Sequence, residues 1–571
     1  MEMPGHLKKY IVDQNYKKYT PEDQAVWRYI MNQIRTILSN SGHEDCLRGI
    51  EASGITYDKI PDIDHMDREL QKFGWRAAVV SGFIPPRAFM DFQIHGILPV
   101  ASELRTIKHI GYTPAPDIVH EAVGHVPFLR DPVFSRFLKT YASTVKKALV
   151  SHEDVKQYTA IRALSDLKEN PEAKEEEIKK LEDHLKKISS EISYTSEASL
   201  LSRFIWWTSE YGLKGSLNDP KIYGAGLISS VSEARQALSQ KVKIKPLTKE
   251  CLNYGYDITK FQPQLFVTPD FEHLLSVLEE ITQTLSWKRG RSFGVQQAIQ
   301  SQTVNTVELD SGLQISGCVE KHLSQGESVE FIKFKGPVQL CFQGQELSGQ
   351  GKEYHQEGYS TPLQWIQKDQ KPAWKLTDEE LRRKGLIPGR NTELKFPSDI
   401  TLKGELAGTL REKGELLLLT FKNCRVQQGE TVLFHPDWGP FDLGLGTRVL
   451  SVFSGPADEK AYGLEDDFQP SVVPKRNFSN EDLEIFQLYR DIEALNTLPK
   501  IKKTEEMSNK LIEKLSHKQK RLWLAGLELL SAVKDFPEQK NRVEEYLDSL
   551  EKKHPSIKGY IKEGKSSGMG D

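Results

Sequence analysis

The spacing of the apolar residues changes twice along this chain of 571 residues, so no single repeating architecture accommodates all of it. Apolar side chains recur at helical intervals in residues 16–50, after the helix-start signal Thr20–Glu22. In residues 303–453, short β-rich runs alternate with Gly, Asn and Asp, which is typical of strands joined by turns. Helical spacing returns in residues 480–561. The chain is therefore predicted to be helical, then β-rich, then helical again.

A highly charged stretch within residues 150–200 is predicted to form an inserted antiparallel helical hairpin. The dipeptide Asn170-Pro171 favours a turn near its centre. Its second half carries a short heptad seam formed by Ile178, Leu181, Leu185, Ile188 and Ile192. Two heptads are too few to specify a partner chain, so an intramolecular hairpin is favoured. Self-association through 150–200 or through the C-terminal helices stays open.

The charges of the chain are nearly balanced, with 77 Lys and Arg against 80 Asp and Glu, a formal net charge of −3. Without an overall positive field, the chain has no general attraction for nucleic acid or anionic lipid. It shows neither a signal peptide nor a run approaching the roughly 18 apolar residues of a membrane span. Five scattered cysteines without a CxxC pair fit a reducing compartment. We expect a soluble cytoplasmic protein with no nucleic acid and no membrane as partner.

Residues 112–127 hold the densest cluster of chemically useful side chains, including His120 and His125. Five residues along a regular α-helix rotate about 140° beyond a full turn, so the two imidazoles would not share one face. We therefore expect the helix to end between them, with Gly124 in the left-handed conformation and Pro127 preventing continuation. His125 would then swing back toward His120, and the pair would form a two-point metal site.

A metal at this point needs a further ligand, for which Glu210 is a candidate. Two neutral imidazoles and one carboxylate, with coordination positions left open, suit non-haem Fe(II), but the same ligands also serve zinc hydrolysis. Ordinary surface or hydrogen-bonded histidines are the remaining alternative. Glu210 follows an aromatic run that begins at Phe204, and it is either a surface group at a helix end or an inward-facing ligand.

Three segments in order resemble the tetrahydropterin-dependent aromatic amino acid hydroxylase family. PAPDIVHEAVGHVPFLRDPVF resembles its iron-binding signature, and WWTSEYGL and YGAGLISS resemble two further segments. The resemblance extends from about residue 83 to 267 and is interrupted by the charged hairpin. It implies that His120, His125 and Glu210 bind Fe(II) as a facial triad, and that a tetrahydropterin, tetrahydrobiopterin or a similar compound, is the second cofactor.

The resemblance also implies how the amino acid substrate is bound. Arg105 aligns with the arginine that holds the substrate carboxylate, and Asp117 aligns with the acid that orients this arginine. A planar guanidinium suits such a bidentate contact. Pro116 and Trp206 would line the slot for the aromatic ring, where apolar, close-packed walls favour burial.

Further aligned residues are expected around the substrate and the pterin. Ser229, also expected at the substrate, and Glu233 would fix a ligand histidine or the substrate arginine, as outer partners of metal sites do. Phe89 aligns with the phenylalanine that stacks on the pterin ring, and Glu121 aligns with an acid that reaches the pterin. Ile258 stands where phenylalanine hydroxylases tend to have an apolar residue and tyrosine hydroxylases an aspartate, which favours phenylalanine.

The predicted organisation follows from the resemblance together with the apolar spacing. Residues 1–290 would form a mainly α catalytic domain of the aromatic amino acid hydroxylase type, with the inserted helical hairpin at 150–200. A β-rich domain of unknown role would occupy 300–460, and a C-terminal helical region 475–571. The Gly- and Ser-rich tail from Glu563 is expected to fray. Any regulation would lie in the C-terminal half.

We therefore expect a monooxygenase that uses O₂, non-haem Fe(II) and a tetrahydropterin to hydroxylate a free aromatic amino acid, converting phenylalanine to tyrosine. One alternative is hydroxylation of tryptophan or another aromatic amino acid, which product analysis would distinguish. A second is a catalytically silent ligand-sensing or scaffold protein whose function lies in residues 300–571. The complete set of two histidines and a glutamate argues against that second alternative.

Overall fold

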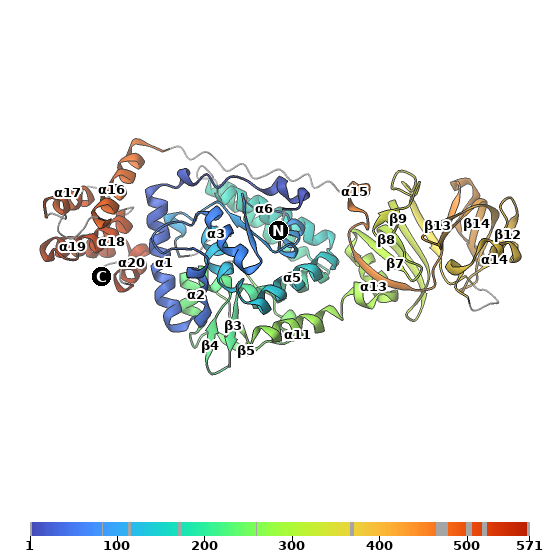
Figure 1. The fold of residues 1–571 in the computed structure, drawn as a ribbon, viewed down its shortest axis with the longest axis horizontal. Coiled ribbons are helices and arrows are strands. Elements are labelled where there is room, and N and C mark those ends of the chain that lie inside the picture. Colours follow the sequence, from blue (N-terminus) through green and yellow to red (C-terminus); the bar gives the residue numbers. More distant parts are fainter. Residues whose placement is uncertain are drawn as a thin grey trace.

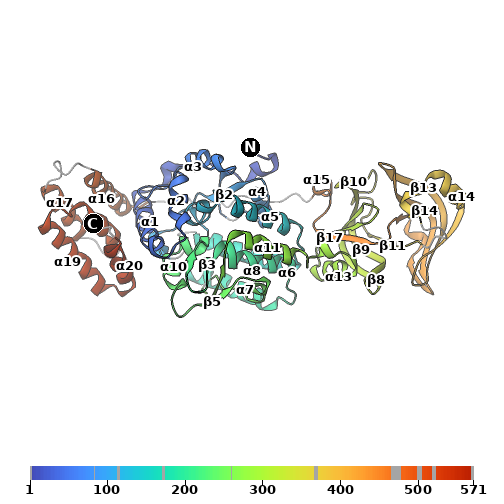
Figure 2. The same ribbon diagram turned by 60° about the horizontal axis from the view of Figure 1, so that its bottom comes forward.

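The computed structural model describes residues 3–82, 84–111, 116–169, 174–258, 260–365, 371–463, 478–497, 505–516 and 522–567. Three groups of elements lie in a row along the long axis (Figures 1 and 2). The β-rich region lies at one end, the N-terminal region in the middle and the C-terminal helices at the other end. The last helices of the chain therefore lie beside its first long helix, α1 (Pro21–Ser41), and not beside the β-rich region.

Helix α1 begins where the sequence signal predicted. The Thr20 side chain accepts a hydrogen bond from the Asp23 amide, and the Asp23 carboxylate accepts one from the Thr20 amide, which completes a capping box. Pro21 occupies the first turn, where its missing N–H costs nothing. One face of α1, with Trp27 and Ile30, is fully buried and forms part of the largest hydrophobic core.

The N-terminal region, residues 3–289, is mixed α/β, which corrects the expectation of a mainly α fold. Two small sheets were missed because their strands have three to five residues and β1 and β2 lack alternation, being buried on both faces. In the first sheet, β1 (Arg76–Val80) runs parallel to β2 (Ile97–Ala101). The second sheet has the strand order β4 (Pro220–Ile222), β3 (Gly212–Gly215), β6 (Gln264–Thr268), β5 (Lys243–Pro246). The helices around them are α2 (Glu44–Ala52), α3 (Ile63–Leu70), α4 (Pro86–Ile94), α5 (Pro132–Lys147), α8 (Glu197–Ile205), α9 (Ala225–Ser229), α10 (Val231–Ala237), α11 (Phe271–Thr282) and α12 (Ser286–Arg289).

The predicted hairpin is present as α6 (His152–Glu169) and α7 (Glu175–Glu191), which pack against each other. An ion pair of 2.8 Å between Lys168 Nζ and Glu182 Oε1 joins the two helices. The predicted turn at Asn170-Pro171 lies outside the described residues. No helix in the described ranges is both long enough and apolar enough to cross a membrane.

The β-rich region contains two antiparallel sheets that follow α13 (Arg291–Ser301), as the strand signals predicted. The first sheet has the order β10 (Gln345–Glu346), β9 (Ser328–Phe342), β8 (Leu313–Gln325), β7 (Val304–Leu309), β17 (Val449–Ser454), with β11 (Gly358–Pro362) also paired to β9. The second has the order β12 (Asn391–Lys395), β13 (Ile400–Glu412), β14 (Glu415–Gln428), β15 (Thr431–Phe434), with β16 (Phe441–Gly444) also paired to β14. Helices α14 (Asp378–Arg383) and α15 (Glu459–Tyr462) accompany them.

The C-terminal helices share one hydrophobic core with the N-terminal region. They are α16 (Asn480–Thr497), α17 (Glu505–Ser516), α18 (Trp523–Ala532), α19 (Pro537–Lys553) and α20 (Pro555–Ser566). Nearly every residue of α18 is buried, as expected of a helix that is apolar on all sides. The expected fraying from Glu563 is wrong as far as Ser566, because α20 continues to that residue and packs against the rest of the protein.

Candidate metal centre

His120 and His125 are brought together by a π-helical turn, His120–His125, and not by a helix end. In a π-helix, residue i+5 hydrogen-bonds to residue i, so two residues five apart lie one turn above each other. The predicted stop at Gly124 is therefore wrong, because the chain continues through the π-turn into a 3₁₀ helix, Val126–Phe128. The spacing of five residues correctly indicated that the two histidines form a pair. A wider helical turn, and not a helix end, brings them together.

Gly124 serves close packing and not a left-handed conformation. A Cβ atom at this position would lie 2.8 Å from the carbonyl oxygen of Ala225 and 2.9 Å from its Cβ. Both distances are shorter than real side chains tolerate, so only glycine allows α9 to approach the π-turn this closely. Helix α9 ends at Ser229, and the approach brings Ser229 beside His120.

A second π-helical turn, Trp206–Glu210, follows α8 and presents the carboxylate. The chain then enters β3, so Glu210 lies between a helix and a short strand. The Glu210 side chain is 20% exposed, and therefore it is an inward-facing group and not the surface residue that the alternative supposed. π-turns inside helices are frequent at functional sites, and both halves of this site are built from one.

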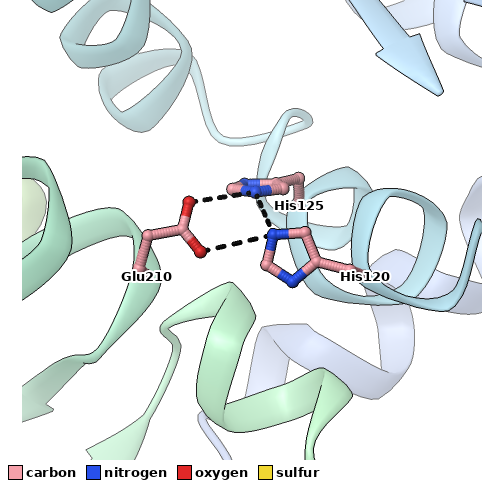
Figure 3. Close-up of side chains that lie close together, drawn as sticks. All are labelled: His120, His125 and Glu210. Atoms are coloured by element: carbon pink, nitrogen blue, oxygen red, sulfur yellow. Dashed lines mark hydrogen bonds and ion pairs between the residues drawn. The ribbon is translucent and has the colours of Figure 1, made fainter. Parts of the chain in front are cut away.

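The three side chains converge on one point (Figure 3). Nε2 of His120 lies 3.2 Å from Nε2 of His125, and the Glu210 carboxylate oxygens lie 3.4 Å and 3.2 Å from these two nitrogens. Ligands bound to a transition metal at about 2.1 Å and separated by roughly right or tetrahedral angles lie about 3.0 to 3.4 Å apart. The spacing and the donor set of two imidazoles and one carboxylate therefore fit Fe(II).

The charges of the three groups depend on one another. Burial lowers the pKa of His120 to about 4. Burial also opposes charge on His125, but the neighbouring Glu210 carboxylate outweighs it and raises the pKa of His125 to about 9. Burial would raise the pKa of Glu210, yet the two imidazoles lower it to about 2. The site thus holds a carboxylate anion that attracts one positive charge, either a proton or a metal cation.

Ser229 orients the first histidine. Its Oγ lies 3.0 Å from Nδ1 of His120, which leaves Nε2 of that ring directed at the metal position. A partner on the far nitrogen fixes the ring and the tautomer of a metal-binding histidine. The backbone oxygen of Ser229 accepts a second bond, of 2.8 Å, from Nη1 of Arg105. Ser229 therefore contacts both the metal-binding His120 and the arginine that was predicted to hold the substrate.

Arg105 and Asp117 form a buried bidentate pair. Nε and Nη2 of Arg105 donate to the two Asp117 oxygens at 2.8 Å and 2.7 Å, and the residues are 5% and 3% exposed. Burial would raise the pKa of Asp117, but the guanidinium outweighs it and lowers this pKa. Within the described ranges, Arg105 uses three of its five side-chain N–H groups, which leaves one on each terminal nitrogen. A guanidinium with N–H groups left on both terminal nitrogens retains donors for an anionic group.

Trp206 lies between two tyrosines beside the carboxylate ligand. Its ring stacks on Tyr211 and Tyr256, with centroid distances of 4.5 Å and 4.2 Å. Its buried Nε1 has no hydrogen-bond partner among the residues that the structure describes. Tyr256 was missed by the sequence reasoning, since no local pattern marks a tyrosine that is 50 residues from the tryptophan on which it stacks.

Two of the residues predicted to contribute to substrate binding lie in exposed positions. Pro116 is exposed, at the edge of residues 112–115, which are not described. Ile258 is 38% exposed, next to Thr259, which is not described either.

The residues expected near the pterin or in an outer position are largely buried. Phe89 is half-buried on α4. Glu121 is 6% exposed, burial raises its pKa to about 8, and its Oε2 has no hydrogen-bond partner in the described part of the chain. Such a buried polar atom fits a group that binds there. Glu233, on α10, is also buried, and burial raises its pKa to about 7.

Comparison with known proteins identifies relatives of the N-terminal half. A sequence model described as "Biopterin-dependent aromatic amino acid hydroxylase" matches residues 9–165 and 184–325, just over half of the chain. The gap between these segments lies in the α6–α7 hairpin.

Curated relatives carry the name phenylalanine-4-hydroxylase. That of Mesorhizobium japonicum is 31% identical over 269 residues, which cover 46% of this chain and 81% of that protein. That of Pseudomonas aeruginosa is 28% identical over 272 residues, 47% of this chain and 86% of that protein. A crystal structure of the iron- and phenylalanine-bound phenylalanine hydroxylase from Chromobacterium violaceum is 24% identical, covers 48% of this chain and 87% of that chain, and has a TM-score of 0.36.

Proposed function

This chain belongs to the biopterin-dependent aromatic amino acid hydroxylase family, and from that premise we propose that it is a monooxygenase converting free phenylalanine to tyrosine. The observation that carries the proposal is the convergence of His120, His125 and Glu210 on one metal position next to the Arg105–Asp117 pair. We propose that residues 1–290 are the hydroxylase domain, with 300–460 and 475–571 as appended β-rich and helical parts.

The three converging side chains would hold the iron, and Glu121 and Phe89 would hold the pterin. When bound, iron and a tetrahydropterin supply the activation of O₂ and the electrons for it, which no side chain of this chain can provide. The Oε2 of Glu121, which has no hydrogen-bond partner among the described residues, supports this assignment, since a buried carboxyl oxygen next to the metal ligands would gain a partner from a bound pterin.

Arg105 would bind the amino acid by its carboxylate. Asp117 and the backbone oxygen of Ser229 both hold the guanidinium, so it is fixed in one orientation and loses little freedom on binding. Because Ser229 also contacts His120, the substrate carboxylate and the metal position are held in a fixed relation. That relation sets which carbon of the side chain reaches the reacting oxygen.

The aromatic ring of the substrate would lie against Trp206. Its stacking between Tyr211 and Tyr256 keeps the indole rigid, and the three rings form an apolar wall that excludes water beside Glu210. We favour phenylalanine over tyrosine or tryptophan because the curated relatives are named phenylalanine-4-hydroxylases, and because Ile258 is apolar at the position that the family resemblance aligns with an aspartate of tyrosine hydroxylases.

The proposal is tested by incubating the purified, Fe(II)-loaded protein in air with phenylalanine, with and without a tetrahydropterin. Tyrosine formation that requires iron, pterin and His120 is the expected result, with His120→Ala as the control and bound iron measured in parallel. Tyrosine and tryptophan are supplied in separate reactions. Turnover of tryptophan alone would overturn the substrate assignment. Retention of iron without any hydroxylation would overturn the proposed activity.

A further inference from the structure

The C-terminal helices are attached to the N-terminal region through α1. Arg28 of α1 donates from Nε and Nη2 to the two carboxylate oxygens of Glu528, at 2.5 Å and 3.0 Å. The Glu528 side chain is 3% exposed, so this pair lies inside the interface. On the next residue of α1, Tyr29 packs edge-on against Trp523 of α18, with ring centroids 5.4 Å apart.

The last helix, α20, extends this contact along α1 toward α10. The Tyr29 hydroxyl donates to the backbone oxygen of Tyr560 at 2.9 Å. The fully buried Gln33 side chain donates to the backbone oxygen of Glu563 at 3.0 Å and accepts a bond of 2.7 Å from Arg235 of α10. Arg235 also forms an ion pair with the Glu563 carboxylate. Helix α20 is therefore fixed to α1 and α10 together.

The Tyr560 ring lies against Gly111, at the end of the loop that begins at Arg105. A Cβ atom at Gly111 would lie 2.7 Å from the Tyr560 hydroxyl and 3.0 Å from Cε1, so the ring touches the loop backbone itself. Tyr560 also stacks on Trp523, with ring centroids 5.9 Å apart, which supports the face of the ring. The end of the loop is thus covered by a side chain more than 400 residues away in the sequence.

The same stretch of loop is held from within by serines at the start of α10. The hydroxyls of Ser230 and Ser232 both donate to the backbone oxygen of Gly111, at 3.3 Å and 3.0 Å. Ser229, the residue before them, binds Arg105 through its carbonyl and His120 through its hydroxyl. A displacement of Gly111 or of α10 would therefore reach the guanidinium that is proposed to bind the substrate.

We propose that α20 braces the amino acid site, with Tyr560 and Glu563 as positioning residues that hold the 105–111 loop and α10 in place for Arg105. This inference rests on the proposed function, since it concerns the affinity of the same site for its amino acid. It gives the C-terminal helices a role in substrate binding. Among the described residues, no residue of these helices contacts the metal-binding side chains. The affinities for iron and for the pterin should be unaffected.

The test is Tyr560→Ala in the full-length, Fe(II)-loaded protein. When one packing contact is lost from a chain of contacts that leads to a binding site, the affinity of that site for its ligand changes by about three- to tenfold. We expect the KM and the calorimetric Kd for phenylalanine to rise by about that factor, while the KM for the pterin and the bound iron stay at wild-type values. Hydrogen exchange of the backbone amides in 105–111 should accelerate. Tyr560→Phe keeps the ring and should restore wild-type behaviour.

Tyr546→Ala is the matched control, because Tyr546 is a half-buried tyrosine of α19 that packs on Gly526 and not on Gly111. It should leave the KM for phenylalanine unchanged. Should Tyr560→Ala fail to fold, Gly111→Ala provides the second test, because the added methyl would push against an intact Tyr560 ring. Gly111→Ala should raise the KM for phenylalanine with iron retained.

The outcomes separate this inference from the proposed function. A wild-type protein that hydroxylates no aromatic amino acid overturns the proposed function and the inference with it. A wild-type protein that hydroxylates phenylalanine, combined with an unchanged KM in Tyr560→Ala and in Gly111→Ala, overturns the brace alone. An equal rise in Tyr546→Ala also overturns it, because the effect would then be a general loosening of the helices.

Discussion

Replacing Ser229 by alanine should weaken iron binding without loosening the arginine. The substitution deletes the Oγ that lies 3.0 Å from His120 Nδ1, but it keeps the backbone oxygen that binds Arg105. Loss of an outer partner of a ligating histidine typically lowers metal affinity about 10- to 100-fold. A hydrogen bond between neutral groups has a net worth of up to about 1.5 kcal/mol, which places the expected loss near tenfold, at the low end of that range.

The Kd for Fe(II) is measured anaerobically by competition with a chelator of known affinity. Ser230→Ala is the matched control, because the Ser230 hydroxyl binds the Gly111 carbonyl and not His120. We expect Ser229→Ala to bind Fe(II) about tenfold more weakly and Ser230→Ala to bind it like the wild type. A Ser229→Ala variant with wild-type affinity, or an equal loss in both variants, would refute the argument that Ser229 orients the ligand.

Three further predictions concern the metal ligands, the substrate arginine and a buried acid. His120→Ala and Glu210→Ala should each lose bound iron, measured by metal analysis after desalting, and either variant with full iron content would exclude that residue as a ligand. Arg105→Lys keeps a charge for Asp117 but loses the planar fork, so the KM for phenylalanine should rise about 10- to 100-fold with iron retained; loss of iron as well would contradict a substrate role. Burial raises the pKa of Glu233 to about 7, above its unfolded value of about 4.3, so the folded state binds the extra proton and stability is lost as the pH rises through this window. Glu233→Gln should therefore gain in Tm relative to the wild type between pH 5 and pH 8, and a pH-independent difference would show that Glu233 does not titrate in this range.

The ligand residues could be named from the sequence, whereas the turn that unites them could not. A spacing of five excludes one face of an α-helix, and the two remaining solutions are a helix end or a wider turn. Gly124 and Pro127 favour the helix end by their usual preferences. The structure takes the wider turn, because Gly124 is needed for contact with Ala225, a residue 101 positions away. Packing against a residue far away in the sequence therefore outweighed the local preference of Gly124 and Pro127 for a helix end.

Regular elements with strong periodicity were predicted well, and short buried strands were not. Helix α1 follows the start signal Thr20–Glu22 and has helical apolar spacing, and the hairpin has its heptad seam, so both were expected. Strands β1 and β2, with five residues each and nearly complete burial, show no alternation. The mixed α/β character of the N-terminal region follows from tertiary contacts that such short segments do not encode locally.

The position of the C-terminal helices illustrates the same limit. Their helical spacing was visible, but nothing local indicates that Tyr560 of α20 packs against Gly111, because the contact joins residues 449 positions apart. The Gly- and Ser-rich composition from Glu563 even favoured fraying, whereas Gln33 and Arg235 anchor that turn. A helix end rich in small residues is ordered here because it is packed, not because its sequence favours a helix.

The buried pair between Arg28 and Glu528 explains how α20 keeps its register. Glu528 is the single charged residue of α18, a helix that is otherwise apolar or small on every side and could slide along α1 with little loss of burial. A buried ion pair adds little net stability, because desolvation offsets the attraction, but it disfavours every arrangement that leaves one charge unpaired. A slip of one turn would move α18 by about 5.4 Å and separate the pair. Since Trp523 of α18 stacks on Tyr560, the same slip would carry Tyr560 off the loop.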